Sequence, residues 1–236
     1  MRFPWMRLAA AGLALLSALP ARAAIEEGYV PGGAPVPSTW YGPADAAAAE
    51  ADRAYIRGMR PHHAGALTMA RDYLADPEAR SPALRRLAEA IIRNQAFEIG
   101  LLDDVARNLD RPPLRLGGLA LQPMATEGVA QRDGFMRSPI PGLLDAAGPV
   151  TARDVQFAKA MSAHHQAALD MARAYQANPA ARNGFLALMN VDIVTDQSQE
   201  IALMRAVTAS YAGDAAAVPV DLGMIHGMEG MGHHHR

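Results

Sequence analysis

Two stretches of the sequence decide its fold: MRPHHAGALTMARDY at residues 59–73 and MSAHHQAALDMARAY at residues 161–175. They share the pattern M-x-x-H-H-x5-M-A-R-x-Y without a gap, at a constant shift of 102 positions. The same shift aligns residues further on, for example Gln95 with Gln197 and Glu98 with Glu200. A register held over roughly fifty positions predicts two copies of one structural unit.

Apolar spacing and chain breakers predict four long helices. Ser81 is a capping residue followed by proline at the first helical position, and Thr151 with Asp154 forms a capping-box pattern. Proline pairs and Asn-Pro or Asp-Pro steps separate the helical stretches. The expected helices cover about 44–75, 82–108, 151–177 and 183–211.

Each repeat is therefore expected to be a helical hairpin, and the fold class to be all-α, a four-helix bundle of two duplicated hairpins. Repeat one covers residues 44–109 and repeat two covers 151–211, so the duplicated bundle spans 44–211. A leader at 25–43 precedes it, and no stretch shows the alternation of a strand. The linker at 110–150 is expected to be mostly irregular, with short helical turns near Val129 and Leu143, and residues 212–236 to form a flexible tail.

Residues 1–24 resemble a signal peptide. Arg2 and Arg7 supply the positive start, an apolar run follows from Leu8 to Leu19, and Ala21-Arg22-Ala23 is an A-x-A cleavage site. The alternative, a membrane anchor, is disfavoured because the run is too short to cross about 30 Å of hydrocarbon. We expect cleavage after Ala23, a periplasmic or secreted product, and no stable membrane insertion after cleavage.

The charge and the residue composition limit the binding partners and metal ligands that the chain can have. The formal charge of −2 would fall to about −5 once the three arginines of residues 1–24 are removed, and no basic face stands out, so nucleic acid is excluded as a partner. The chain has no cysteine, which excludes disulfides and thiolate metal sites. Any soft ligand must come from its 13 methionines.

The histidines and methionines of the two repeats fall on one helical stripe, with each second histidine at its edge. A single histidine in a core usually satisfies itself by a hydrogen bond, and methionine there usually fills space. Two matched pairs of histidines, each between two methionines, favour metal ligation, with a structural or proton-related role as the alternative. The candidate metal ligands are Met59, His62, His63 and Met69 in the first repeat, and Met161, His164, His165 and Met171 in the second.

The second helix of each repeat places a carboxylate on its apolar face. Glu98 shares that face with Gln95, and Glu200 shares its counterpart with Gln197 and Met204. A buried carboxylate is costly unless it is paired or bound. We expect Glu98 and Glu200 to accept a hydrogen bond from a ligating imidazole or to act as ligands themselves, with Met204 as a further candidate. The alternative is that both glutamates reach solvent at the end of the bundle.

Donor chemistry favours copper. Thioether sulfur suits Cu(I), and imidazole also accepts Cu(II). Zinc is disfavoured because no thiolate is present, and calcium and magnesium because oxygen-rich clusters are absent. A di-iron site would need several inward glutamates and two E-x-x-H motifs, which Glu98 and Glu200 do not provide.

The tail, residues 212–236, carries the same donor types, methionine and histidine, but it is not expected to contribute to a hydrophobic core. Its methionines and histidines, interleaved with glycine, predict a flexible arm that collects copper. A cloning tag or random low complexity are the alternatives. The residues are Met224, His226, Met228, Met231, His233, His234 and His235.

The two His-His blocks, MRPHHAGA at residues 59–66 and MSAHHQAA at residues 161–168, are each followed by Met-Ala and later by Gln-x-x-Glu-Ile. With these motifs the chain resembles the bacterial family called domain of unknown function 305, over roughly 45–110 and 150–211. The resemblance implies an exported, ferritin-like four-helix bundle and copper binding through the matched histidines and methionines. The second hairpin follows the family pattern at Met204, whereas the first has Leu102 where methionine is expected. This difference implies unequal affinities in the two halves.

Three functional hypotheses follow. The leading one is a non-enzymatic exported protein that sequesters copper, or transfers it to other copper-handling proteins. The second is a metal-dependent oxidase using copper or a di-iron centre, which would need an open coordination position. The third is a structural bundle in which the tail alone binds metal.

Overall fold

Helices make up most of the structure. The computed structural model describes residues 36–142 and 148–227. The four long helices are α1 (Ala46–Ala75), α2 (Pro82–Leu109), α4 (Ala152–Ala177) and α5 (Gly184–Ala209). The short helix α3 (Val129–Arg132) lies where a helical turn was predicted near Val129. A 3-10 turn, η2, covers Leu222–Met224. The predicted positions of all four long helices are confirmed to within two residues; the turn near Leu143 lies outside the described residues.

Side-chain caps fix where the long helices begin. The Asp45 carboxylate accepts hydrogen bonds from the backbone N–H groups of Ala47 and Ala48 at the start of α1. Ser81 and Asn183 cap α2 and α5 in the same way. At α4, Thr151 and Asp154 form both bonds of the predicted capping box. These caps satisfy N–H groups that have no partner within the helix, so the boundaries follow directly from the sequence.

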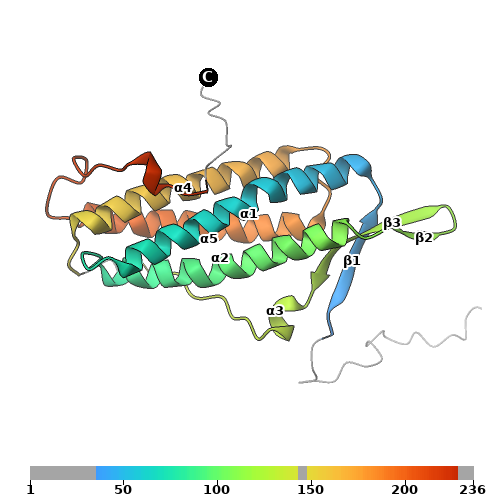
Figure 1. Ribbon diagram of the computed structural model, residues 1–236, viewed down its shortest axis with the longest axis horizontal. Helices are drawn as coiled ribbons and strands as arrows, with labels where there is room; N and C mark the ends of the chain where they lie inside the picture. The colour runs from blue at the N-terminus through green and yellow to red at the C-terminus, as the bar shows by residue number, and fades with distance from the viewer. Residues whose placement is uncertain (1–35, 143–147, 228–236) are drawn as a thin grey trace, which may run out of the picture. The chain divides into compact units, whose positions relative to one another are not determined.

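The long helices pack as two hairpins that lie against each other. Helix α1 packs on α2, α4 packs on α5, and the hairpins meet mainly through α1 and α4 (Figure 1). Helix α1 runs antiparallel to α4, because Tyr73 near the end of α1 contacts Asp154 at the start of α4 while Asp52 near the start of α1 contacts Tyr175 near the end of α4. No helix in residues 36–142 and 148–227 has both the length and the apolar character needed to cross a membrane.

A small antiparallel sheet corrects the expectation of an all-α chain. Its strands are β1 (Ser38–Pro43), β2 (Leu114–Leu116) and β3 (Leu119–Glu127), in the order β1-β3-β2. The predicted leader thus pairs with the predicted linker, far away in sequence. Strand β3 also contacts α2, where the backbone N–H of Thr126 donates to Asp104 at 2.7 Å. The sequence could not show this sheet because β2 is too short for alternation and β1 contains glycine and proline.

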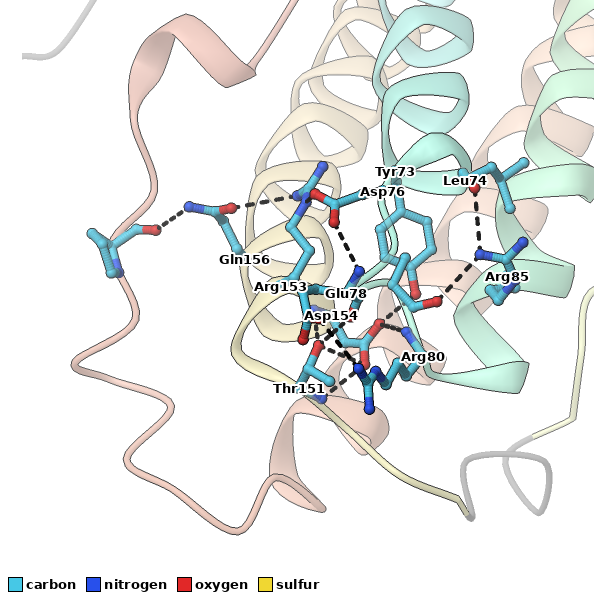
Figure 2. A network of polar contacts seen from close by, with 12 residues as sticks. Tyr73, Leu74, Asp76, Glu78, Arg80, Arg85, Thr151, Arg153, Asp154 and Gln156 are labelled. Carbon is cyan, nitrogen blue, oxygen red and sulfur yellow. Dashed lines mark hydrogen bonds and ion pairs between the residues drawn. The ribbon is translucent and has the colours of Figure 1, made fainter.

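Each junction between α1 and α4 is tied by a buried aspartate. At one end, the carboxylate of Asp154 accepts hydrogen bonds from the Tyr73 hydroxyl at 2.6 Å and from the backbone N–H groups of Arg80, Ser81 and Thr151 (Figure 2). Its side chain is fully buried. One carboxylate therefore connects the α1–α2 turn to the cap of α4.

Asp52 makes the equivalent contacts at the other end of α1 and α4. It accepts hydrogen bonds from Tyr175 at 2.7 Å and from the side chain of Asn183, the cap of α5, at 3.0 Å. Burial raises the pKa of Asp52, although the hydrogen bonds from Tyr175 and Asn183 oppose this rise. Asp52 and Asp154 are separated by the same 102 positions as the histidines. The shared sequence register thus corresponds to matching contacts at the two ends.

Replacing Asp154 with asparagine should lower the free energy of unfolding by about 2–4 kcal/mol, because an amide N–H₂ would face buried N–H donors. The exposed Asp170 on the same helix serves as the control, since Asp170→Asn should change stability by less than about 0.5 kcal/mol. Urea denaturation followed by circular dichroism measures both. Equal stabilities of the two variants would contradict the role given to Asp154.

Candidate metal centre

The four predicted histidines meet in the interior between the two hairpins. Helix α1 supplies His62 and His63, α4 supplies His164 and His165, and none of the four is exposed to solvent. The rings of His62 and His164 stack with their centroids 3.6 Å apart and their planes 29° apart. The antiparallel packing of two helices that carry the same motif brings these two rings face to face.

We call the stacked residues His62 and His164 the inner histidines, and His63 and His165 the outer histidines. Each outer histidine lies against a buried glutamate of its own hairpin. The Nε2 atom of His63 is hydrogen-bonded to Glu98 Oε2 at 2.9 Å. The Nε2 atom of His165 is 2.6 Å from Glu200 Oε2, but the two atoms are not aligned for a hydrogen bond. Both glutamates are 3% exposed, so the alternative in which they reach solvent at the end of the bundle is wrong.

An arginine from the linker completes this arrangement. Arg137 Nη1 lies 2.7 Å from Glu98 Oε1 and 2.8 Å from Asp196 Oδ2, and so connects the linker to both hairpins. Burial alone would raise the pKa of Glu98, but the hydrogen bond with His63 and the charge of Arg137 lower it overall. Arg137 was not predicted as part of the site, because nothing in the sequence distinguishes it from other linker arginines.

Burial keeps the stacked histidines neutral. It lowers the pKa of His62 to about 3, with the nearby charges of His63 and His165 adding to the effect. Burial also lowers the pKa of His164 well below its ordinary value, with the neighbouring histidines again contributing. A neutral imidazole is the form that binds a metal, because its lone pair is free.

Within the part of the chain that the structure describes, most nitrogens of these four imidazoles have no hydrogen-bond partner. Nε2 of His62 bonds the backbone carbonyl of His164 at 3.0 Å, which leaves Nδ1 of that ring free. The unpartnered ring atoms are Nδ1 of His62, His63, His164 and His165, and Nε2 of His164 and His165. Buried polar atoms are rarely left unpaired in proteins, and such a group points to a ligand.

The residues fit a soft metal by donor type, although they are not arranged around a common point. Among residues 36–142 and 148–227, no three His, Cys, Asp or Glu side chains are grouped so as to hold a metal ion. Ligation by more than one of the inner imidazoles would therefore require their rings to rotate out of the present stack.

The predicted methionines flank the histidines along α1 and α4. Met59 and Met161 are fully buried and Met69 is 4% exposed, whereas Met171 is only partly buried. Met59 packs in an apolar cluster with Tyr55 and Tyr175, and Met161 and Met69 pack in another with Tyr73 and Phe157. Met204 is also fully buried, and its sulfur lies 3.7 Å from the Ser162 hydroxyl. Their role as ligands stays a prediction.

The tail donors divide into two groups. Met224 and His226 lie against the helices, where they line a cavity with Met69 of α1. The first part of the predicted flexible tail thus has defined contacts, which the sequence did not indicate. The remaining predicted tail ligands, Met228, Met231, His233, His234 and His235, lie outside the described residues.

The chain matches the model of a family described as "Domain of unknown function (DUF305)" over residues 52–208. The chain belongs to this family. The match covers most of both hairpins and all of the linker between them, which confirms the resemblance inferred from the two His-His blocks. The four buried histidines of this DUF305 chain all lie within the matched range.

Two solved structures are similar to the chain. One is "CopM in the Cu(I)-bound form", at 27% identity and a TM-score of 0.43, and the other is "CopM in the Ag-bound form (by co-crystallization)", at 25% identity and a TM-score of 0.41. Each similarity covers 69% of this chain and 98% of the other. Superpositions this loose do not transfer a ligand site from one protein to the other. No curated protein matches the DUF305 chain significantly.

The buried neutral histidines should make stability depend on pH. The pKa of His62 is lower in the folded state than in the unfolded state, so the unfolded state binds more protons below about pH 6.5. Stability should therefore be complete above pH 6.5 and be lost progressively as the pH falls toward 3. Urea denaturation of the metal-free protein at a series of pH values measures this slope.

The double variant His62→Leu/His164→Leu serves as the comparison. It removes the two imidazoles whose protonation is suppressed, so its stability should fall less steeply over the same pH range. Identical slopes for the two proteins would contradict the suppressed protonation of the inner pair.

Proposed function

We propose that this protein binds copper as cargo, through the paired histidines of α1 and α4 and the methionines that flank them, and that it sequesters the ion or hands it on. The observation that supports this most directly is the set of unpartnered nitrogens on His62, His63, His164 and His165. Burial keeps His62 and His164 neutral, and each of the four rings has at least one buried nitrogen without a hydrogen-bond partner among the described residues. A metal ion would use their lone pairs.

Ring orientation favours Nδ1 as the ligating atom of two histidines. In His63, Nε2 bonds the carboxylate of Glu98, and in His62, Nε2 bonds a backbone carbonyl. Both acceptors require the proton on Nε2, which leaves the Nδ1 lone pair free. Glu98 thus acts as a positioning residue that fixes the tautomer of His63, a common arrangement behind metal-binding histidines.

The donor set favours copper over harder ions. Neutral imidazole and thioether groups suit Cu(I), and imidazoles also accept Cu(II), whereas zinc and iron sites usually include thiolates or several carboxylates. Here Glu98 is already paired with His63 and Arg137. The carboxylates of Glu98 and Glu200 would also offset the positive charge that a copper ion brings into the interior.

The wider proposal includes fold type and location. We propose that the two hairpins are duplicated units of a ferritin-like four-helix bundle, that residues 1–24 direct export, and that the mature protein acts in the periplasm or outside the cell. There it would exchange copper with other copper-handling proteins. The role is binding without catalysis, so oxygen consumption in the presence of Cu(I) or Fe(II) should stay at the level of the metal alone.

Removal of the four imidazoles should abolish copper binding by the helical body. The suitable variant combines His62→Leu and His164→Leu with His63→Gln and His165→Gln, because glutamine can still donate a hydrogen bond to each glutamate. Anaerobic competition with a chromophoric Cu(I) chelator measures binding, and circular dichroism checks that the helices remain. High-affinity Cu(I) binding by the folded variant at the wild-type stoichiometry would contradict the proposal.

Deletion of residues 222–236 separates the helical body from the tail. The truncated chain should keep the copper held by the histidines and lose only the ions bound by the tail. Complete loss of copper binding on truncation would instead identify the tail as the whole binding site, with the helices as a structural module.

A further inference from the structure

The described part of the tail is fastened along the outside of α4. Lys159 Nζ donates to the carbonyl of Val218 at 2.6 Å and to that of Ala215 at 3.1 Å. The side chain of Gln156 donates to the carbonyl of Pro219 at 3.1 Å. Val220 and Ile225 then pack against the apolar cluster between the helices. The chain is thus guided from the end of α5 back over α4 toward α1 (Figure 1).

Two glycines allow the tail to touch α1 directly. A Cβ atom on Gly65 would lie 2.3 Å from the carbonyl oxygen of His226 and 2.8 Å from the nitrogen of Gly227. A Cβ atom on Gly227 would lie 2.7 Å from the carbonyl oxygen of Pro61, and Gly227 has a φ of +75° that other residues rarely adopt. Backbone meets backbone at this point, so neither glycine accepts a side chain without displacement of the tail.

This contact brings three soft donors to one cavity. The cavity, of about 150 Å³, lies between α1 and α4 and is lined by Met69, Met224 and His226, among other residues. The turn that carries Met224 is held by Asp221, which accepts a hydrogen bond from the N–H of Gly223 at 2.9 Å. The His226 ring is 40% exposed and its Nε2 lies 4.0 Å from the carboxylate of Asp72. The ring is therefore accessible from solvent.

We propose that Met69, Met224 and His226 form a second soft-metal site, at the surface, which takes Cu(I) from solvent or from a donor protein. Two thioethers and one imidazole are a neutral, soft donor set of the kind that selects Cu(I). The cation that also lines this cavity, Arg153, is paired with Asp76 at 2.8 Å, which reduces its repulsion of a metal ion (Figure 2). The site needs the tail in place, because two of its three donors come from the tail.

The position of Met69 suggests a route inward. Met69 is 4% exposed and belongs to the same apolar cluster as Met161, which precedes the histidines of α4 by three positions. Met69 therefore lines the surface cavity and also packs in the interior cluster that contains Met161. The inward route rests on the copper-binding function proposed above, whereas the surface site does not.

The decisive variant is Gly65→Ala in the full chain. It keeps every donor, and alanine favours the helix, so loss of binding would not reflect unfolding. The added methyl group displaces His226 and Gly227 and should weaken one Cu(I) equivalent by about tenfold to a hundredfold, the usual effect of disturbing residues that position metal ligands. Gly100→Ala is the control, because a Cβ atom there meets nothing within 4 Å.

Anaerobic chelator competition on both glycine variants gives the number of Cu(I) equivalents and their affinities. Met224→Leu should lose the same equivalent, and adding Gly65→Ala to it should cause no further loss, since both changes act on one site. Met136→Leu, at a methionine that is 75% exposed in the linker, should bind like the wild type. Equal Cu(I) affinities of Gly65→Ala and Gly100→Ala would overturn the surface site.

The two proposals fail independently. The variant lacking the four histidines should retain the surface equivalent and lose the interior one. If that variant loses nothing while Gly65→Ala is impaired, the surface site stands and the interior site is wrong. If Gly65→Ala binds normally while the histidine variant is impaired, the interior site stands and the surface site is wrong.

Discussion

The main physical constraint on the structure is a buried stack of two imidazoles, His62 on His164, which the contact between the two hairpins has to accommodate. Buried imidazole nitrogens without hydrogen bonds are unfavourable, each costing on the order of 1–3 kcal/mol. Other contacts must offset this cost. Apolar clusters lie on either side of the histidines along α1 and α4, and the Asp52 and Asp154 hydrogen bonds join the same two helices nearer their ends. The apolar clusters and the two aspartate networks therefore stabilise the contact between α1 and α4 at which the imidazoles are buried.

The helices could be predicted from the sequence because their signals are local. Caps such as Ser81 and Thr151 act on N–H groups within three residues, and the histidine stripe follows from the helical repeat alone. The pairing of His63 with Glu98 could also be anticipated, since a buried carboxylate requires a partner. Asp52 was missed, and Asp154 was predicted only as part of the α4 capping box, although the two aspartates share the 102-residue register of the histidines. That register was the signal that could have revealed them.

Other features could not be predicted because they depend on contacts between distant segments. The sheet pairs Ser38 with Glu127, and neither strand carries a clear alternating pattern. Arg137 reaches Glu98 and Asp196 from a linker without regular structure around it. The contact of Gly227 with α1 depends on where the tail returns to the helices. In each case the residue types are ordinary and only the fold gives them a partner.

The two hairpins are alike in sequence but unequal in electrostatics. Glu98 is hydrogen-bonded to His63 and paired with Arg137, whereas Glu200 Oε2 makes a close, misaligned contact with His165 and has no hydrogen-bond partner within residues 36–142 and 148–227. Near their ends, α1 and α4 are joined by the Tyr73–Asp154 and Tyr175–Asp52 hydrogen bonds. If α1 and α4 moved apart at either end, a buried tyrosine–aspartate hydrogen bond would break, whereas rotation of the side chains between these bonds breaks neither. Access to the buried imidazoles that leaves both ends joined would therefore need side-chain rotation between α1 and α4 rather than separation of the helices.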